Sequence, residues 1–156
     1  MLKTAKHTLL IGIGNYGRSD DALGWNFIDT FASHDDLFDI EYRYQLQVED
    51  SELISRYEHV IFVDATQATM EDGFSFYKCV PQNTSAFTTH KLEPEMVLWL
   101  AQELYSKQPE AHVLAIRGES WELHHGLSEQ ARENFNKAVA FFMAHINSME
   151  LSPAAL

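Results

Sequence analysis

Two carboxylates and one histidine in this sequence have the residue types and positions expected of a metal-binding site. Asp21 follows the first predicted strand, Asp64 ends the third, and His90 lies in the loop after the fourth. Open parallel sheets bind ligands beyond the carboxyl ends of their strands, so these three side chains are expected to meet at one edge. Carboxylate and imidazole groups suit zinc or another divalent ion and leave coordination positions open for water or substrate.

Each of these residues also has a structural alternative. Asp21 and its neighbour Asp20 could complement the dipole of the following helix, and Asp20 is expected to stay outside the ion site. Asp64 could cap the loop after its strand, and His90 could be an ordinary loop histidine. The apolar run 60–63 favours a functional role for Asp64, because a carboxylate buried there without a partner is costly.

Further ionisable residues follow the fifth predicted strand, namely Glu119, His124 and His125. They are second candidates, which either contact substrate or close the site. Cys79 is the one cysteine of the chain, so it forms no internal disulfide, and its place among aromatic residues favours an inert buried thiol over a nucleophile. The sequence has no nucleophile-elbow serine, no paired-histidine zincin helix and no Walker loop.

The glycine turn 12–17, GIGNYG, has the spacing of a dinucleotide-binding fingerprint after a strand. Asp20 and Asp21, however, would crowd a pyrophosphate bound at this turn. Asp39 and Glu41 open the second strand, whereas the acidic residue that binds the ribose is expected near its end. These features disfavour nicotinamide or flavin binding and favour a turn that presents Asp21 at the edge of the sheet.

The elements that must position these residues alternate between strand and helix. Apolar patterning predicts strands at 8–14, 39–46, 59–63, 74–80 and 112–116. Helical spacing, with Ser19 and Ser128 as N-caps, predicts helices at 19–33, 50–57, 94–106 and 128–147. We therefore expect a single three-layer α/β domain over residues 1–156, in which helices cover both faces of a twisted, mostly parallel five-stranded sheet. The fourth strand is expected to be antiparallel, and residues 146–156 are expected to fray.

Composition narrows the class of protein. The 156 residues carry a net charge of −12 and 11 Lys and Arg residues spread along the chain, which argues against nucleic-acid binding. No segment reaches the ~20 apolar residues of a membrane span, and the apolar run that stops at Gly12 is too short for the core of a signal sequence. We expect a cytoplasmic monomer that does not bind membranes.

Four separated motifs, in order, resemble the hydrogenase maturation proteases, which trim the carboxyl-terminal extension of nickel-iron hydrogenase large subunits. The first motif, GIGNYGRSDDALG at 12–24, is similar to the family's glycine turn followed by an acidic pair. The second and third are VIFVDA at 60–65, a strand ending in Asp-Ala, and TTHKL at 88–92, before a helix. The fourth is HHGLS at 124–128, after the last strand.

The resemblance implies that Asp21, Asp64 and His90 are the metal-contacting and catalytic residues. It implies an endopeptidase that cuts a hydrogenase large-subunit precursor after nickel insertion and recognises the nickel that the precursor carries. Zinc or a similar divalent ion could take the place of nickel. The free protein is then expected to hold no metal of its own.

Two features depart from the family pattern. Asp21 stands where the family often has Glu, and QLQVE at 45–49 replaces an Asp-Gly-Gly-Thr-like segment. Together with RGESWEL at 117–123, this replacement resembles the branch that serves bidirectional, cofactor-linked cytoplasmic hydrogenases. If these departures abolish cleavage, the alternative is a non-catalytic accessory protein that binds nickel or the hydrogenase. A nucleotide-binding enzyme that uses the glycine turn is a further, less favoured alternative.

Overall fold

The fold is organised around one five-stranded sheet. The computed structural model describes residues 8–34, 37–85 and 91–150. The strand order is β2-β1-β3-β5-β4, and the strands are β1 (Thr8–Ile13), β2 (Asp39–Arg43), β3 (His59–Thr66), β4 (Phe74–Cys79) and β5 (Glu110–Arg117). The first four strands of this order are parallel, and β4 runs antiparallel to β5 at one edge. The predicted α/β class, the mostly parallel sheet and the antiparallel fourth strand are confirmed.

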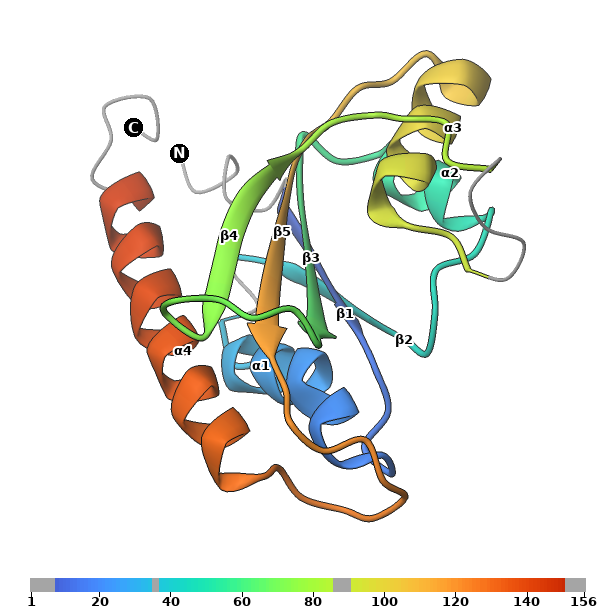
Figure 1. Cartoon of the computed structure of the whole chain (residues 1–156). Coiled ribbons are helices and arrows are strands. Elements are labelled where there is room, and N and C mark those ends of the chain that lie inside the picture. Colours follow the sequence, from blue (N-terminus) through green and yellow to red (C-terminus); the bar gives the residue numbers. More distant parts are fainter. Residues whose placement is uncertain (1–7, 35–36, 86–90, 151–156) are drawn as a thin grey trace.

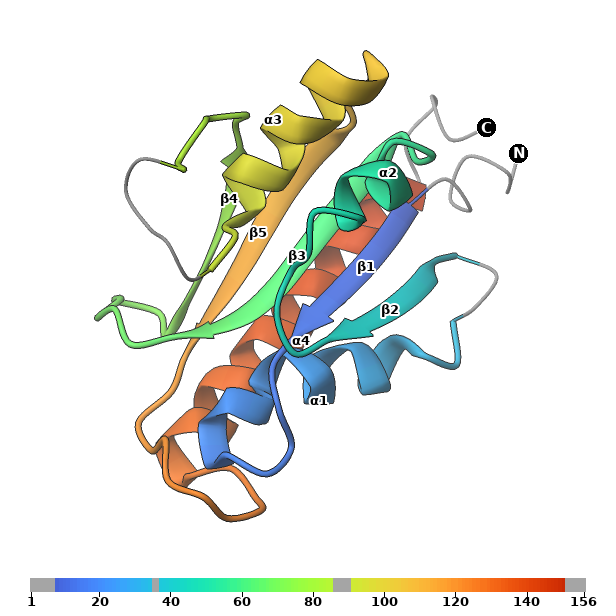
Figure 2. The same ribbon diagram turned by 90° about the vertical axis from the view of Figure 1, so that its right-hand side faces the viewer.

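Helices cover both faces of the sheet (Figures 1 and 2). They are α1 (Leu23–Phe31), α2 (Asp50–Ile54), α3 (Pro94–Tyr105) and α4 (Glu129–Glu150). On one face, α1 and α4 pack aromatic residues such as Phe27 and Phe142 over Leu10 of β1. On the other face, α2 and α3 cover Leu9 and Ile11. Successive residues of β1 therefore enter opposite cores, which explains why this strand is apolar throughout.

Several predicted boundaries were wrong. β3 continues through Asp64 to Thr66, because its register with β5 holds to Arg117. The final helix extends to Glu150 instead of fraying from 146, since Ile146 is buried in the core beneath α4. Ser128 is the N-cap of α4 as predicted, since its hydroxyl accepts the backbone N–H of Ala131 at 3.2 Å.

The start of the first helix also differs from the prediction. A 3₁₀ turn, η2 (Ser19–Ala22), precedes α1. Ser19 does not cap the helix; it has a left-handed backbone (φ 51°) and its hydroxyl donates to the carbonyl of Glu122 at 2.9 Å. Gly24 packs closely on the sheet, as expected: a Cβ there would lie 2.5 Å from the carbonyl oxygens of Ile13 and Val63. Among the described residues, no helix is long and apolar enough to cross a membrane.

Candidate functional site

In the turn after β1, most backbone N–H groups already donate hydrogen bonds within the protein, so few of them could bind an anion. The backbone N–H of Gly14 donates to the carbonyl of Arg43 at 2.9 Å, and that of Asn15 donates to the carbonyl of Asp21 at 3.0 Å. The following N–H groups are also engaged, and they belong to Gly17, Arg18, Ser19, Asp20 and Asp21. A phosphate cradle needs such groups to point outward. The resemblance of this turn to a dinucleotide fingerprint is therefore one of spacing and not of geometry.

Gly14 is required because the backbone of Asp21 folds back onto it. A Cβ at position 14 would lie 2.1 Å from the carbonyl oxygen of Asp21, closer than any real contact. The glycine thus lets the chain reverse and fixes the start of η2 against the end of β1. This close approach directs the Asp21 side chain toward the carboxyl ends of the parallel strands.

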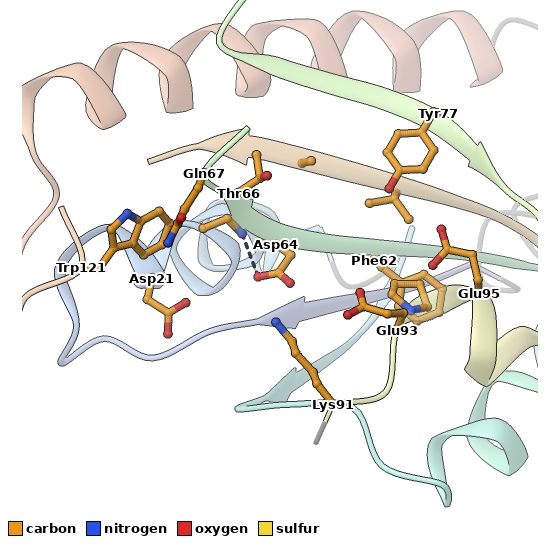
Figure 3. A pocket seen from close by; sticks show the side chains of 14 residues that line it. Asp21, Phe62, Asp64, Thr66, Gln67, Tyr77, Lys91, Glu93, Glu95 and Trp121 are labelled. Carbon is orange, nitrogen blue, oxygen red and sulfur yellow. Dashed lines mark hydrogen bonds between the residues drawn. The ribbon is translucent and has the colours of Figure 1, made fainter. Parts of the chain in front are cut away.

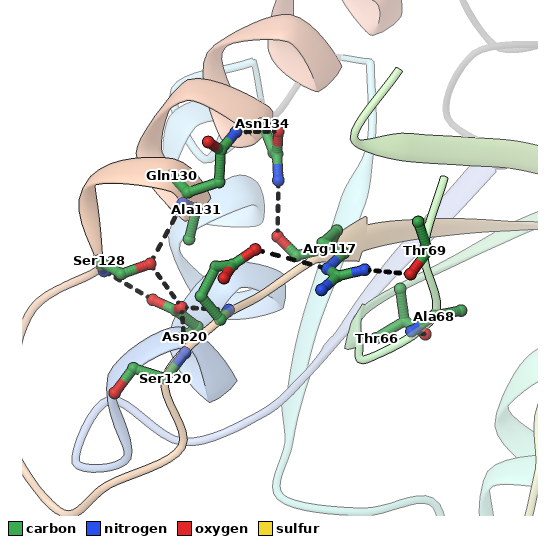
Figure 4. Close-up of polar contacts among 11 residues, drawn as sticks. Asp20, Thr66, Ala68, Thr69, Arg117, Ser120, Ser128, Gln130, Ala131 and Asn134 are labelled. Carbon is green, nitrogen blue, oxygen red and sulfur yellow. Dashed lines mark hydrogen bonds and ion pairs between the residues drawn. The ribbon is translucent and has the colours of Figure 1, made fainter. Parts of the chain in front are cut away.

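Asp20 has a different task from its neighbour (Figure 4). Its fully buried carboxylate accepts the backbone N–H groups of Glu119, Ser120 and Ser128 at 2.6, 2.8 and 2.7 Å, and the Ser128 hydroxyl at 2.7 Å. Burial raises the pKa of Asp20, but these hydrogen bonds outweigh it and hold the pKa below its usual value. Asp20 ties the loop between β5 and α4 to the turn that carries Asp21.

Asp21 and Asp64 line one pocket of about 480 Å³ at the carboxyl edge of the sheet (Figure 3). Its other lining residues come from β3, β4, β5, the loops after β3 and β5, and the start of α3 with the residues before it: Phe62, Ala65, Thr66, Gln67, Tyr77, Lys91, Glu93, Pro94, Glu95, Val113, Ala115 and Trp121. The convergence of Asp21 and Asp64 agrees with the strand-end argument. Asp20 does not line this pocket, in agreement with its expected separation from the site.

The carboxylate of Asp64 is poised to exchange a proton near neutral pH. Burial raises its pKa to about 7, although Lys91 and the backbone N–H of Ala65 oppose the shift, while Asp21 adds to it. The hydrogen bond from Ala65, at 2.8 Å, is the local capping contact foreseen as an alternative. This single hydrogen bond does not compensate for the cost of burying the carboxylate, so Asp64 can still bind a cation or a proton.

Among the described residues that line the pocket, Lys91 carries the positive charge. Burial raises the pKa of Asp21, and the positive charges of Lys91 and Arg18 partly reverse that shift. Figure 3 shows the ammonium group of Lys91 directed toward the space between Asp21 and Asp64. Lys91 had no predicted role in the sequence, where it stands within the TTHKL motif. The feature of the sequence that could have pointed to Lys91 is its position directly after His90.

The long connection between β4 and α3 brings Lys91 to this edge. Because β4 is antiparallel, its carboxyl end lies at the opposite edge from those of β1, β3 and β5, so the strand-end argument for residues after β4 was wrong. An antiparallel bridge between Leu46 and Leu92 holds the end of this connection beside the segment after β2. His90 itself lies outside the described residues.

The second candidates lie outside the pocket. Glu119 pairs with Arg117 at 3.6 Å, and the exposed His124 is bonded through Nδ1 to the carbonyl of His125 at 2.8 Å. Trp121, from the same loop, lines the pocket instead, which nothing in the sequence had indicated. Burial raises the pKa of Cys79 to about 12, which supports the expectation of an inert thiol.

Two of the three predicted donors, Asp21 and Asp64, lie among the described residues. Over residues 8–34, 37–85 and 91–150, no group of three His, Cys, Asp or Glu side chains is arranged to hold a metal. Asp21 and Asp64 supply two oxygen donors, and their raised pKa values show that both carboxylates lack full compensation for their burial. A divalent cation brought into the pocket would provide that compensation.

Solved structures of similar fold include hydrogenase maturation proteases. The hydrogenase maturating endopeptidase HybD of Escherichia coli is 19% identical, with 91% of this chain and 93% of that chain covered and a TM-score of 0.66. The [NiFe] hydrogenase maturation protease HycI of Thermococcus kodakarensis is 21% identical, covers 88% and 90%, and has a TM-score of 0.67. An uncharacterized protein from Wolinella succinogenes is 14% identical, covers 92% and 99%, and has a TM-score of 0.65.

No model of a protein family and no curated protein matches the sequence. At these identities the likeness to the solved structures establishes a shared fold over nearly the whole of each chain.

Proposed function

We propose that this chain is an endopeptidase that removes the carboxyl-terminal extension of a nickel-iron hydrogenase large-subunit precursor after nickel insertion. The observation that carries the proposal is the joint exposure of Asp21 and Asp64 to one pocket, within a fold shared with maturation proteases. The four ordered sequence motifs support the same assignment. Nickel belongs to the precursor in this scheme and is part of the substrate.

The residues of the pocket suit a cationic substrate centre. Asp21 and Asp64 offer hard oxygen donors whose ionised forms a divalent ion would favour, and His90 is the third proposed ligand. Lys91 offsets part of the negative charge in the absence of such an ion. We infer that a precursor lacking nickel leaves the two carboxylates uncompensated and is bound less well.

Asp64 is the proposed general base. In the free protein the Asp64 carboxylate, with a pKa of about 7, is partly ionised at neutral pH. In the complex its ionised form would accept a proton from the water that attacks the scissile carbonyl. It can then return that proton to the leaving amine. The metal carried by the precursor would polarise the carbonyl or the water. Asp21, which lines the same pocket, would hold and orient the same centre.

The test compares nickel-loaded and nickel-free forms of one precursor, with product masses measured after incubation. Cleavage of the loaded form alone is expected, and EDTA treatment of the enzyme before mixing is expected to leave this activity intact. Equal cleavage of both forms would exclude nickel as the recognition signal. Binding of the precursor without any shortening would instead identify a non-catalytic accessory protein.

A nucleotide-dependent enzyme is disfavoured by the engaged N–H groups of the glycine turn. Addition of NAD or ATP is accordingly expected to leave the melting temperature unchanged, whereas a rise in melting temperature would contradict this view.

A further inference from the structure

Four aromatic side chains form a surface cluster, here called the Trp25 patch. Trp25 lies at its centre, with ring centroids of Tyr16, Tyr42 and Tyr44 at 4.8, 5.5 and 5.1 Å. The Tyr16 and Tyr42 rings meet Trp25 edge-on, at 81° and 87°, while Tyr44 is tilted by 37°. The patch joins three parts of the chain: the turn after β1, helix α1, and β2 with the residue after it.

The Trp25 patch is open to solvent although it is strongly aromatic. Tyr16, Tyr42 and Tyr44 are 39%, 38% and 72% exposed, respectively. Aromatic residues that carry both an apolar ring and a polar group are enriched in protein–protein interfaces, and clusters of them on a surface mark interaction sites. The Tyr44 ring packs beside Trp25 and leaves most of its surface open to a partner.

Hydrogen bonds hold the patch in one arrangement. The hydroxyl groups of Tyr16 and Tyr42 both donate to the carboxylate of Asp29, the first at 2.7 Å. The indole N–H of Trp25 donates to the carbonyl of Arg43 at 3.0 Å. Since these rings are already fixed, a partner would lose little of its binding energy to ordering them.

The negative charge around the Trp25 patch favours a positively charged partner. Aromatic faces attract cations, and the Asp29 carboxylate adds a negative charge next to the rings. Arg43, on the strand below, has its guanidinium engaged by Glu41 and Asp50 at 2.9 and 3.0 Å. The chain as a whole carries a net charge of −12. A segment with Arg or Lys side chains is complementary to this surface.

Hydrogen bonds connect the Trp25 patch to the turn that carries Asp21 of the proposed active site. Tyr16 belongs to the same turn as Asp21, between β1 and α1. The Arg43 carbonyl accepts both the Trp25 indole and the backbone N–H of Gly14, the glycine against which Asp21 folds. A partner bound at the patch therefore rests on the segment that carries Asp21.

We propose that the Trp25 patch docks a positively charged segment of the precursor, outside the pocket where cleavage takes place. The inference rests on the proposed function and adds a second contact to it. The patch would supply affinity and orientation, while the pocket would supply the chemistry. Its loss should therefore weaken binding without changing the rate of the bound complex.

The first experiment measures kcat and KM for nickel-loaded precursor with Tyr44→Ala and Tyr44→Arg. The exposed Tyr105 at the end of α3 provides the matched control, Tyr105→Ala. We expect Tyr44→Ala to raise KM about threefold to tenfold with kcat unchanged, and Tyr44→Arg to raise it further through like-charge repulsion. An unchanged KM in both Tyr44 variants would overturn the docking role. Cleavage by the wild type would then leave the proposed function standing.

The second experiment tests the patch without the precursor. The protein is labelled with 5-fluorotryptophan, the resonance of Trp25 is assigned with Trp25→Phe, and tetra-arginine amide is added, with neutral tetra-citrulline amide as control. A shift of the Trp25 resonance that only tetra-arginine produces, and that Tyr44→Arg abolishes, supports a cation-binding surface. An equal response to both peptides, or none, would overturn it. If the wild type cuts no precursor, this titration still decides the chemistry of the patch.

Discussion

Asp20 and Ser128 are joined twice across 108 positions of the chain, since one carboxylate oxygen of Asp20 accepts the Ser128 N–H and the other accepts its hydroxyl, both at 2.7 Å. Ser128 is also the N-cap of α4. One buried carboxylate therefore fixes the turn after β1, the loop after β5 and the start of the last helix. Its neighbour Asp21 is left to face the pocket, so two adjacent aspartates have separate tasks.

Asp20→Asn should destabilise the fold by about 2–4 kcal/mol, because it removes a buried charged acceptor that serves four donors. Urea unfolding at pH 7 measures the change. The pKa of Asp20 is lowered on folding, so its contribution is present above the usual carboxyl range and lost as pH falls through it. Ser128→Ala should cost less, about 1–2 kcal/mol, because the three backbone donors to Asp20 remain. Equal stability of wild type and Asp20→Asn would contradict this account.

Asp64→Asn should reduce processing of loaded precursor at least about hundredfold while leaving the fold at least as stable. The folded-state pKa of Asp64 is raised to about 7, so ionisation of this group costs stability as pH rises from about 4 to 7. Above pH 7 the Asn variant should melt at a higher temperature than the metal-free wild type, and below about pH 4 the difference should vanish. The control is Glu119→Gln, a carboxylate outside the pocket, which should change neither quantity.

Lys91→Gln should move the acid limb of the pH–rate profile to higher pH, because the Lys91 charge lowers the pKa of both Asp64 and Asp21. The profile is taken from kcat/KM for loaded precursor between pH 5 and 9. Lys107→Gln, which removes an exposed lysine after α3, is the matched variant and should leave the profile in place. If the profile of Lys91→Gln matched that of the wild type, Lys91 would not affect the pKa values of the pocket carboxylates.

Gly14→Ala should destabilise the protein by about 1–3 kcal/mol and reduce processing, since the new methyl group would overlap the Asp21 carbonyl and displace the start of η2. Gly17→Ala lies in the same turn, where the nearest atom would be 3.4 Å away, and should be nearly neutral. Urea titration and precursor cleavage are measured for both. Similar values for the two variants would show that the close approach at Gly14 is not needed.

His112→Phe should flatten the dependence of stability on pH near the titration range of histidine. Burial lowers the pKa of His112, opposed by Glu110 and assisted by His145, Lys78 and His59. Since the unfolded chain binds this proton more readily, the wild type loses stability as pH falls through about 6.5, and the variant lacks that loss. Phe keeps the ring that stacks on Phe76 at 4.8 Å. Thermal melts from pH 8 to 5 test this, with the exposed His124→Gln as control.

Local patterning was enough to predict the layers of the fold. Apolar runs and helical spacing predicted all five strands and four helices, and the short link before β4 predicted its antiparallel direction. Asp21 and Asp64 could be predicted to converge because parallel strands carry their following residues to a common edge. The nickel specificity, the role of His90 and the hydrogenase branch remain predictions from the motifs.

The sequence predicted that Asp20 stays outside the ion site, but only the tertiary structure decided which groups its carboxylate binds. Asp20 and Asp21 follow the same turn and have the same chemistry, and the donors to Asp20 come from residues about a hundred positions away. Lys91 and the Trp25 patch owe their places to similar long-range packing, through the Leu46–Leu92 bridge and the Arg43 carbonyl respectively. The physical reason is that periodicity reports which face a residue buries, whereas the partner it meets there depends on the path of distant loops.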